Sequence, residues 1–276
     1  MTNDATHDRA SFEQQGTEFL KANLGGESEY NYAANRPPLS YALAGRILTT
    51  VLEDGAVRVR HRFTEQQVEW EMITGPSAGD HDIRPYEAFE LAENVFFVSF
   101  LARDHESIAM AVDLLSGAVT IIQGLIEDKD IVSRVLKGRV EEVGTSGPVG
   151  HPPFSLGGTR LLNEYAHNVA YEHIYLTGVY ETWLGVRGPQ AGQADTEEYR
   201  SFKIRDGVYL LYWNEKILTT QMTFLFNFFQ GQCVGQVFAL VEGQRVHNTI
   251  GARTRLIHTK LSELPDVLHL DVYSGV

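Results

Sequence analysis

The chain has 276 residues, which is enough for one large or two ordinary domains, and 43% of them are hydrophobic, as in globular proteins. The net charge of −13 argues against nucleic acid and anionic membranes as partners, because phosphate groups bind clustered lysine and arginine. The one cysteine, Cys233, excludes a disulfide framework, and no apolar run is long enough to span a bilayer.

The N-terminal residues 1–36 are predominantly polar and end in the turn-prone sequence Asn35-Arg36-Pro37-Pro38. We predict that they form an arm or lid outside the core, with a short helix over residues 11–24. Residues 1–16 lack the apolar segment of a signal peptide, and we therefore expect a cytoplasmic protein.

From Leu43 onward the chain repeats itself at a shift of 113 residues, which carries Trp70 onto Trp183. The same shift carries Gly75-Pro76-Ser77-Ala78-Gly79 onto Gly188-Pro189-Gln190-Ala191-Gly192. A repeat of this length indicates two copies of a domain, not a solenoid of short units. We predict an N-terminal domain at residues 37–145 and a C-terminal domain at residues 151–276.

Each copy has the pattern of an antiparallel β domain, with short alternating or apolar runs between turn residues. Closing such strands into a barrel removes exposed edges, and we predict a calycin- or lipocalin-like barrel for each copy. A sandwich of two sheets fits the same pattern. Residues 127–143 are predicted to begin as a short helix and then to supply the last strand. The strands predicted in the first copy lie near 45–52, 56–63, 66–73, 86–91, 94–101, 107–113 and 118–123.

The alternation of side chains predicts which face of a strand lies inside each barrel. Between residues 57 and 63 the valines and Phe63 share one face, and Arg58, Arg60 and Arg62 share the other. Three arginines inside a small barrel would be costly to bury, so we expect them outside.

Read in the same register, the second copy has Glu172 inside its barrel, where the first copy has Val59. Tyr171, His173 and Tyr175 are then expected outside, where they would pack between the two halves or form the surface of a homodimer.

A second acid, Glu215, is expected inside the second barrel at the position of Ala102 in the first copy. The first barrel is therefore predicted to be filled by apolar side chains, whereas the second has two acids and aromatic walls. Pockets for small ligands have this mixture of apolar walls and a few polar groups, so we predict the site in the second barrel. The aromatic residues expected to line it are Trp183, Tyr209 and Trp213.

A purely structural interpretation of the two acids is also open. Glu215 would then form an ion pair with Lys216 at the rim, and Glu172 would bond to Arg160 or Tyr199.

Several runs in the second copy resemble the C-terminal half of the molybdenum cofactor biosynthesis protein F family, most densely from about Val169 to Glu242. The N-terminal half is similar more loosely, through Leu43-Ala44-Gly45-Arg46, Asp54-Gly55 and Trp70. The resemblance implies tandem calycin-type barrels and a place near molybdenum cofactor metabolism. At the level of the fold, the barrel also resembles phenolic acid decarboxylases, which use Tyr, Arg and Glu without a cofactor. The runs that carry the first resemblance are 170–176, Trp183, Gly188-Pro189, Ala194-Asp195-Thr196, Lys203 and 209–216.

Motifs for phosphate, dinucleotide or zinc binding do not occur in the sequence. Asp80-His81-Asp82 has the side chains of a metal site but lies in a turn, and we interpret it as loop capping. Cys233 lies in a strand context and is interpreted as a buried structural thiol. We therefore predict neither a metal site nor a cofactor.

The first functional hypothesis is an enzyme, a lyase or isomerase that acts on a small, partly aromatic substrate without a cofactor. Glu172 or Glu215 would be the general acid or base, with a pKa raised by the apolar barrel. Tyr199 or Tyr209 would donate a hydrogen bond to a substrate oxygen. The basic residues that would bind a carboxylate or phenolate at the mouth are Lys216 and Arg200.

The second hypothesis is a non-catalytic carrier of a small metabolite, pterin-like in view of the resemblance. Trp183 and Trp213 would stack on the ligand, the acids would bond to its ring nitrogens, and His173 is a further candidate contact. A structural dimerisation module is the third hypothesis.

Overall fold

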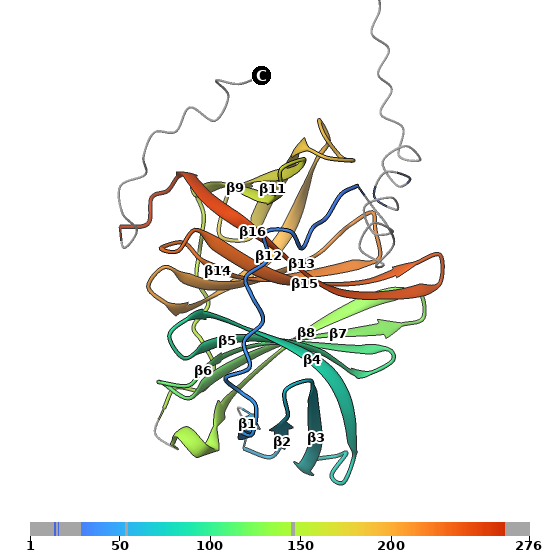
Figure 1. Cartoon of the computed structure of the whole chain (residues 1–276), viewed down its shortest axis with the longest axis vertical. Coiled ribbons are helices and arrows are strands. Elements are labelled where there is room, and N and C mark those ends of the chain that lie inside the picture. The colour runs from blue at the N-terminus through green and yellow to red at the C-terminus, as the bar shows by residue number, and fades with distance from the viewer. Residues whose placement is uncertain (1–13, 15, 17–28, 53–54, 145–146, 263–276) are drawn as a thin grey trace, which may run out of the picture.

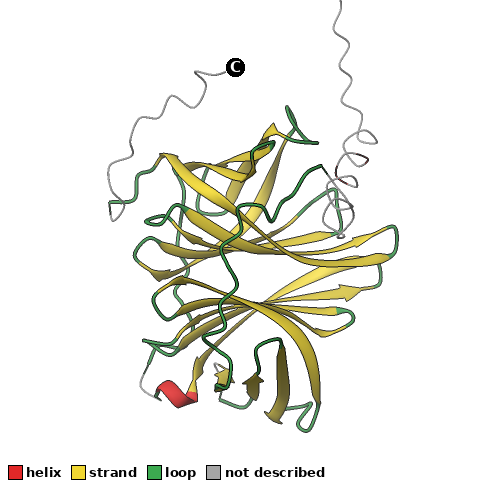
Figure 2. Cartoon of the chain, viewed as in Figure 1, coloured by secondary structure: helices red, strands yellow, loops and turns green. Residues whose placement is uncertain are grey.

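The structure is a computed structural model that describes residues 14, 16, 29–52, 55–144 and 147–262. It contains two closed antiparallel barrels, each with eight strands (Figure 1). Nearly every element in the described residues is a strand, and the 3₁₀ turn η1 (Glu141–Val143) is the red segment at the lower left of Figure 2. The prediction of tandem barrels is confirmed, and the sandwich is excluded.

The first barrel contains β1 (Ile47–Leu52), β2 (Arg58–Phe63), β3 (Gln67–Thr74), β4 (His81–Ala92), β5 (Val95–Arg103), β6 (Glu106–Asp113), β7 (Ala118–Glu127) and β8 (Asp130–Val140). The second contains β9 (Arg160–Ala166), β10 (Val169–Tyr175), β11 (Tyr180–Arg187), β12 (Ala194–Arg205), β13 (Val208–Asn214), β14 (Thr220–Asn227), β15 (Gln232–Val241) and β16 (Gln244–His258).

The repeat in the sequence is a repeat of the strands. Both bounds of β11 and β12 lie 113 residues after those of β3 and β4, and Trp70 and Trp183 hold the same place in their strands. Tyr86 and Tyr199 are likewise equivalent, in β4 and β12. The duplication is therefore confirmed at the level of single residues.

Two expectations about helices have different outcomes. The order predicted for residues 127–143 is wrong, because β8 comes first and η1 follows it. Asp128, with a φ of 57°, makes a tight turn that leads β7 directly into β8 and leaves no room for a helix. Apart from residues 14 and 16, the helix predicted over residues 11–24 lies outside the described residues. None of the described helices is long and apolar enough to cross a membrane.

In the first barrel, the prediction that the arginines of β2 face outward is confirmed. Arg60 pairs with Glu71 at 2.5 Å and Arg62 pairs with Glu69 at 2.8 Å. Val59, which alternates with them, lines the space inside the barrel.

The same assignment is wrong for β10. His61 lies opposite Trp70, and His173 lies opposite Trp183, so these two histidines are equivalent although they are 112 residues apart. The connection from β9 to β10 is one residue shorter than the connection from β1 to β2. The connection from β10 to β11 is one residue longer than the connection from β2 to β3. Because side chains alternate along a strand, this slip of one residue turns every side chain of β10 to the opposite face.

The slip reverses the expected positions of the β10 side chains. Tyr171, His173 and Tyr175 face the interior of the second barrel, and they do not form a surface between halves or subunits. Glu172 faces away from that interior and bonds to Arg160 Nε, as the structural interpretation of the sequence expected.

The two barrels pack directly against each other through β4–β8 of the first and β12–β15 of the second, one above the other in Figure 1. Phe97 and Leu225 are fully buried in this contact. The contact also contains the ion pair of Arg205 with Asp113 at 2.5 Å and the hydrogen bond from Ser99 Oγ to Gln236 at 2.7 Å.

The described part of the N-terminal arm runs along both barrels, as the blue ribbon in Figure 1 shows. Tyr32 is only 2% exposed and belongs to the core of the second barrel, where its carbonyl accepts a bond from Gly251 N. Ser40 N bonds to Ala88 O of the first barrel, and Leu43 is buried in that barrel's core. The expectation that residues up to 36 lie outside the core is therefore wrong for Tyr32.

Candidate functional site

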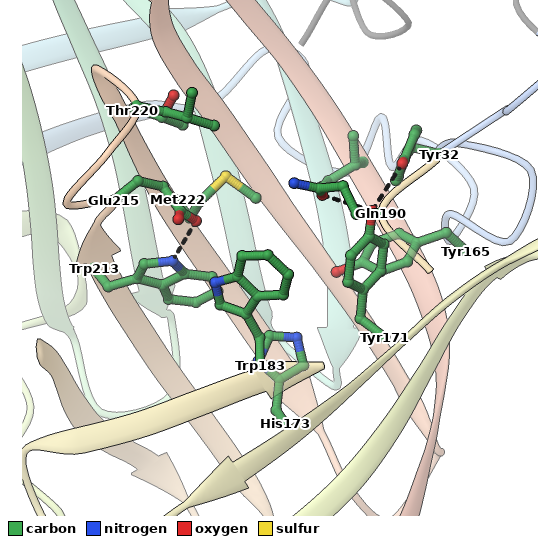
Figure 3. Close-up of a pocket in the computed structure, with 12 residues that line it drawn as sticks. Tyr32, Tyr165, Tyr171, His173, Trp183, Gln190, Trp213, Glu215, Thr220 and Met222 are labelled. Carbon is green, nitrogen blue, oxygen red and sulfur yellow. Dashed lines mark hydrogen bonds between the residues drawn. The ribbon is translucent and has the colours of Figure 1, made fainter. Parts of the chain in front are cut away.

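The interior of the second barrel contains a cavity with about 500 Å³ of empty space, open solvent at its mouth included. Its walls come from β9–β11, from β13, β14 and β16, from the loops at Gln190 and Glu215, and from the N-terminal arm. Most of the labelled side chains in Figure 3 converge on this space. The residues that line it are Tyr32, Tyr165, Tyr171, His173, Trp183, Gln190, Trp213, Glu215, Leu218, Thr220, Met222 and Ile250.

Aromatic rings form much of the cavity wall. Trp213 stacks on Phe224 with ring centroids 5.6 Å apart and an interplanar angle of 12°. Trp183 lies edge-on to Tyr171 at 6.1 Å, and both tryptophans are almost completely buried. A flat aromatic ligand would find both faces and edges of rings to pack against.

Tyrosine hydroxyl groups form a chain at one side of the cavity, at the right in Figure 3. The Tyr32 and Tyr171 hydroxyls are 3.0 Å apart, and Tyr171 donates to Gln190 Oε1 at 2.9 Å. Burial raises the pKa of both tyrosines well above the ordinary value, so both hydroxyls stay protonated.

Glu215 presents a carboxyl group to the cavity at the end of β13. Trp213 Nε1 donates a hydrogen bond to Glu215 Oε1 at 2.9 Å (Figure 3). Burial raises the pKa of Glu215 to about 7, with further increases from Glu181 and Asp195, while the bond from Trp213 and the nearby His173 oppose the rise. The acid and carboxylate forms therefore coexist near neutral pH.

Two further glutamates lie behind this group on neighbouring strands. Glu181 of β11 and Glu197 of β12 are cross-strand partners, and both are fully buried. Burial, and then the charge of Glu215, raise the pKa of Glu197 to about 8, although Lys216 opposes the rise. Lys216 N donates to Glu197 Oε1 at 3.3 Å, and its Nζ lies 3.8 Å from Oε2.

His173 connects the aromatic wall to these acids. Its Nδ1 is hydrogen-bonded to Glu181 Oε2 at 2.9 Å, and its ring lies 5.8 Å from that of Trp213. The other oxygen, Glu181 Oε1, is buried and has no hydrogen-bond partner among the described residues, and neither has Thr220 Oγ1. Buried polar atoms of this kind are costly unless something bonds to them.

Four of the residues predicted for the site line the cavity, namely Glu215, Trp183, Trp213 and His173. Lys216 lies next to it, beyond the end of β13, and contacts Glu197. The strand ends at Asn214, so Lys216 lies in the connection that follows it.

The other predicted residues lie elsewhere. Glu172 is on the opposite face of β10, and Arg200 is half exposed and pairs with Glu198 at 2.5 Å. Tyr209 is buried in the core, stacked on Phe154 at 4.9 Å, and does not line the cavity. Tyr199 also lies outside the lining.

The Tyr199 hydroxyl is engaged by the backbone. It donates to Thr177 O at 2.9 Å and accepts a bond from Leu156 N at 3.2 Å. Its equivalent in the first barrel, Tyr86, bonds in the same way to Thr64 O at 2.8 Å. A bond repeated in both barrels indicates a structural role for this hydroxyl.

Glu181 and Glu197 were not predicted, although the repeat contains a signal for them. They replace Val68 and Arg84 of the first barrel. The residues that line the cavity but were not predicted to do so are Tyr32, Tyr165, Tyr171, Gln190, Leu218, Thr220, Met222 and Ile250.

The prediction that apolar side chains fill the first barrel is wrong. That barrel contains a cavity of its own with about 600 Å³ of empty space, open solvent at its mouth included. In the described part of the chain, no group of three His, Cys, Asp or Glu side chains is placed to hold a metal ion. Asp80 and Asp82 of the predicted capping loop pair with Arg103 and Arg84.

The fold and the cavity define a class of protein with two fused eight-stranded barrels, one of which encloses an aromatic pocket with buried acids. Residues 29–128 match the MoaF N-terminal domain, and residues 151–260 match the MoaF C-terminal domain. The chain therefore belongs to the MoaF-like family.

A curated relative, Protein MoaF of Klebsiella aerogenes, is 26% identical over 170 residues. The match covers 55% of this chain and 65% of that protein. A crystal structure of a proposed β-lactamase from Burkholderia vietnamiensis superposes with a TM-score of 0.33 and 15% identity, over 38% of this chain and 97% of that one. A similarity at this level carries no functional argument.

Proposed function

We propose that the second barrel binds a small, partly aromatic molecule and catalyses a proton transfer within it, as a lyase or isomerase that relies on its own side chains. The observation that carries the proposal is the carboxyl group of Glu215, which lines the cavity, is held by Trp213 and has a pKa of about 7. A group that exchanges protons near the working pH is suited to general acid–base catalysis.

In this proposal Glu215 is the residue that touches the substrate. Its carboxylate takes a proton from one atom of the substrate, and the resulting acid returns a proton to another atom or to a leaving group. Glu197 and Glu181 are positioning residues that act through Glu215. Because these acids lie close to Glu215, ionisation of Glu215 next to another negative charge is costly, and the proton affinity of Glu215 stays high.

The surroundings of the acids also restrict the ligand. Buried carboxyl groups without enough hydrogen-bond donors favour a ligand that brings N–H groups or a positive charge. The faces and edges of Trp183 and Trp213 favour a flat ring. A nitrogen heterocycle such as a pterin has both properties, and it agrees with the metabolic setting that the sequence resemblance implies.

A carrier without catalysis is the second candidate. The observation that favours it is Tyr32, which comes from the N-terminal arm, lines the cavity and bonds to Tyr171, so that the arm would add to the wall around a bound molecule. Enclosure protects a reactive metabolite and equally excludes water from a reaction.

The test is to screen pteridines and hydroxylated aromatic acids for binding and turnover by NMR, with wild-type protein and three variants. We expect Glu215→Gln to reduce turnover roughly 10²-fold or more with little change in affinity, because Gln keeps the shape but carries no exchangeable acid proton. Trp213→Ala should weaken binding at least about tenfold through lost ring contact. Glu198→Gln is the matched control, since Glu198 adjoins Glu197 but is about half exposed and pairs with Arg200.

The outcomes separate the candidates. Binding without turnover, weakened by Trp213→Ala and little affected by Glu215→Gln, would favour the carrier. If Trp213→Ala and Glu215→Gln both behaved as wild type, the second barrel would not be the site.

A further inference from the structure

The cavity of the first barrel differs in its chemistry from that of the second. It has about 600 Å³ of empty space, open solvent at the mouth included. Phe100 and Trp70 are the aromatic walls, and the rest of the lining is chiefly aliphatic or methionine. Residues representative of that lining are Val59, Met72, Met110, Ile121 and Leu136.

Two polar atoms in this apolar wall are unsatisfied. His61 Nδ1 and Trp70 Nε1 are both buried and have no hydrogen-bond partner among the described residues. The two side chains are cross-strand partners on β2 and β3, and both line the cavity. Burial lowers the pKa of His61 to about 4, although a hydrogen bond to the Leu48 backbone opposes the fall, so the ring is neutral at physiological pH and one of its two nitrogens can accept a hydrogen bond. Trp70 Nε1 can only donate one.

The charges at this cavity compensate one another. The Arg103 guanidinium lies 5.4 Å above the Trp70 ring and pairs with Asp80 at 2.6 Å and with Glu106 at 3.1 Å. Glu106 also accepts a bond from Gln123 Nε2 at 2.6 Å. The described residues that line this cavity thus offer a ligand no uncompensated charge, and an ionised ligand would lose its hydration without gaining an ion pair.

We propose that the first barrel is a second, independent binding site for an uncharged aliphatic molecule that carries one hydroxyl group. The hydroxyl oxygen would accept the Trp70 Nε1 hydrogen, and its own hydrogen would be donated to His61 Nδ1. The aliphatic body would occupy the space between the methionine and branched side chains. This site does not depend on the reaction proposed for the second barrel.

Trp70 itself provides the readout, because the chain has three tryptophans and the other two belong to the second barrel. In a Trp183→Phe/Trp213→Phe protein, the fluorescence of Trp70 is titrated with 1-decanol, with decanoate and with decane. We expect a saturable change with 1-decanol, and affinities at least about fivefold weaker for the other two, because each loses the hydroxyl bonds or adds a charge.

Variants in the same background test where the alcohol binds. His61→Phe should weaken 1-decanol binding about fivefold or more through the lost hydrogen bond. Ala102→Leu, at the cavity wall, should weaken it by filling the space. His258→Phe is the matched control, since His258 is exposed at the end of β16, and it should have no effect.

Circular dichroism establishes that each variant is folded, and Ala102→Leu remains informative if His61→Phe is not. The proposal is overturned if 1-decanol gives no saturable change, if decanoate or decane binds as tightly, or if folded variants at both positions bind it as the parent does.

Discussion

Three acids in the second barrel replace Val68, Arg84 and Ala102 of the first, and this accounts for much of the chemical difference between the two interiors. Burial is the main reason why Glu197 and Glu215 have pKa values of about 8 and about 7. The charges of neighbouring acids raise both pKa values further, those of Glu215 and Asp195 at Glu197 and those of Glu181 and Asp195 at Glu215. The reactive property therefore depends on the buried setting as well as on the acids themselves.

These pKa values predict how stability depends on pH. Between the ordinary glutamate value of 4.5 and about 8, the folded protein holds protons that the unfolded chain has released, so stability falls as pH rises through this window. In Glu197→Gln this position no longer binds a proton, so its contribution to the pH dependence is lost. We expect the difference between the urea midpoints of Glu197→Gln and wild type to be larger at pH 8.5 than at pH 5.5, in favour of the variant.

The comparison with wild type is essential, because His61, His151 and His247 have pKa values lowered to about 4 and change stability in the opposite direction below pH 6.5. Glu198→Gln, on the exposed side of the same strand, should follow wild type. An identical pH dependence for Glu197→Gln and wild type would contradict the assignment.

The Tyr199 hydroxyl offers a second test at the scale of one residue. Tyr199→Phe removes two hydrogen bonds to buried backbone and should cost about 1–2 kcal/mol of unfolding free energy. Tyr86→Phe removes the single equivalent bond of the first barrel and should cost less. Denaturant unfolding measures both, and a loss of ligand binding by folded Tyr199→Phe would show that its hydroxyl has a role in the site.

At the scale of the element, the position of β10 decides the site. Its slip of one residue brings Tyr171 and His173 to the interior and removes Glu172 from it. The adjacent strand β11 accommodates the loop at Gln190 through Gly185, where a Cβ atom would lie 2.0 Å from Gln190 O. The equivalent residue in the first barrel is Met72, so this close approach is specific to the second.

Gly185→Ala is therefore expected to displace the Gln190 loop. Because the colliding atom belongs to the backbone, we expect a loss of about 1–3 kcal/mol in denaturant unfolding and weaker ligand binding, since Gln190 anchors Tyr171. Gly178→Ala is the control, because its Cβ would meet only the Ser155 side chain, and it should be close to wild type. Equal stability of the two variants would show that the loop yields freely.

At the scale of the whole molecule, the barrels share a core. Phe89, Phe97 and Ile122 of the first are buried against Leu210 and Leu225 of the second. Burial of each large apolar side chain contributes about 1.5–3 kcal/mol to the free energy of unfolding. The net free energy of unfolding of a domain is only about 5–15 kcal/mol, so a few such side chains matter. Separation of the barrels would expose this surface to water.

We accordingly expect the barrels to unfold together. In the Trp183→Phe/Trp213→Phe protein, Trp70 fluorescence reports the first barrel, while circular dichroism reports both. The substitutions weaken the second barrel, so independent barrels would lose circular dichroism signal before fluorescence. A single coincident transition is expected, and Leu225→Ala should lower its midpoint for both probes by removing about 2–5 kcal/mol from the shared core.

The sequence by itself determined the duplication and the strand content, while the choice of closed barrels over sandwiches came from the structure. Period-two alternation, turn residues and matched landmarks such as Trp70 and Trp183 are local signals, and they survive in any arrangement of the strands. They also placed Glu215, Trp183 and Trp213 in the interior of the second barrel, where the 113-residue register holds.

Only the tertiary structure decided the rest of the site. The connection before β10 is one residue shorter and the connection after it one residue longer, so the 113-residue repeat is kept on both sides. The two faces of β10 are nevertheless exchanged, and the spacing of residues in the sequence does not reveal this. Tyr32 and Gln190 reach the cavity from segments far from β13 in the sequence. The pKa of Glu215 depends first on its burial and then on its distances to Glu181 and Asp195 on neighbouring strands, and both exist only once the barrel has closed.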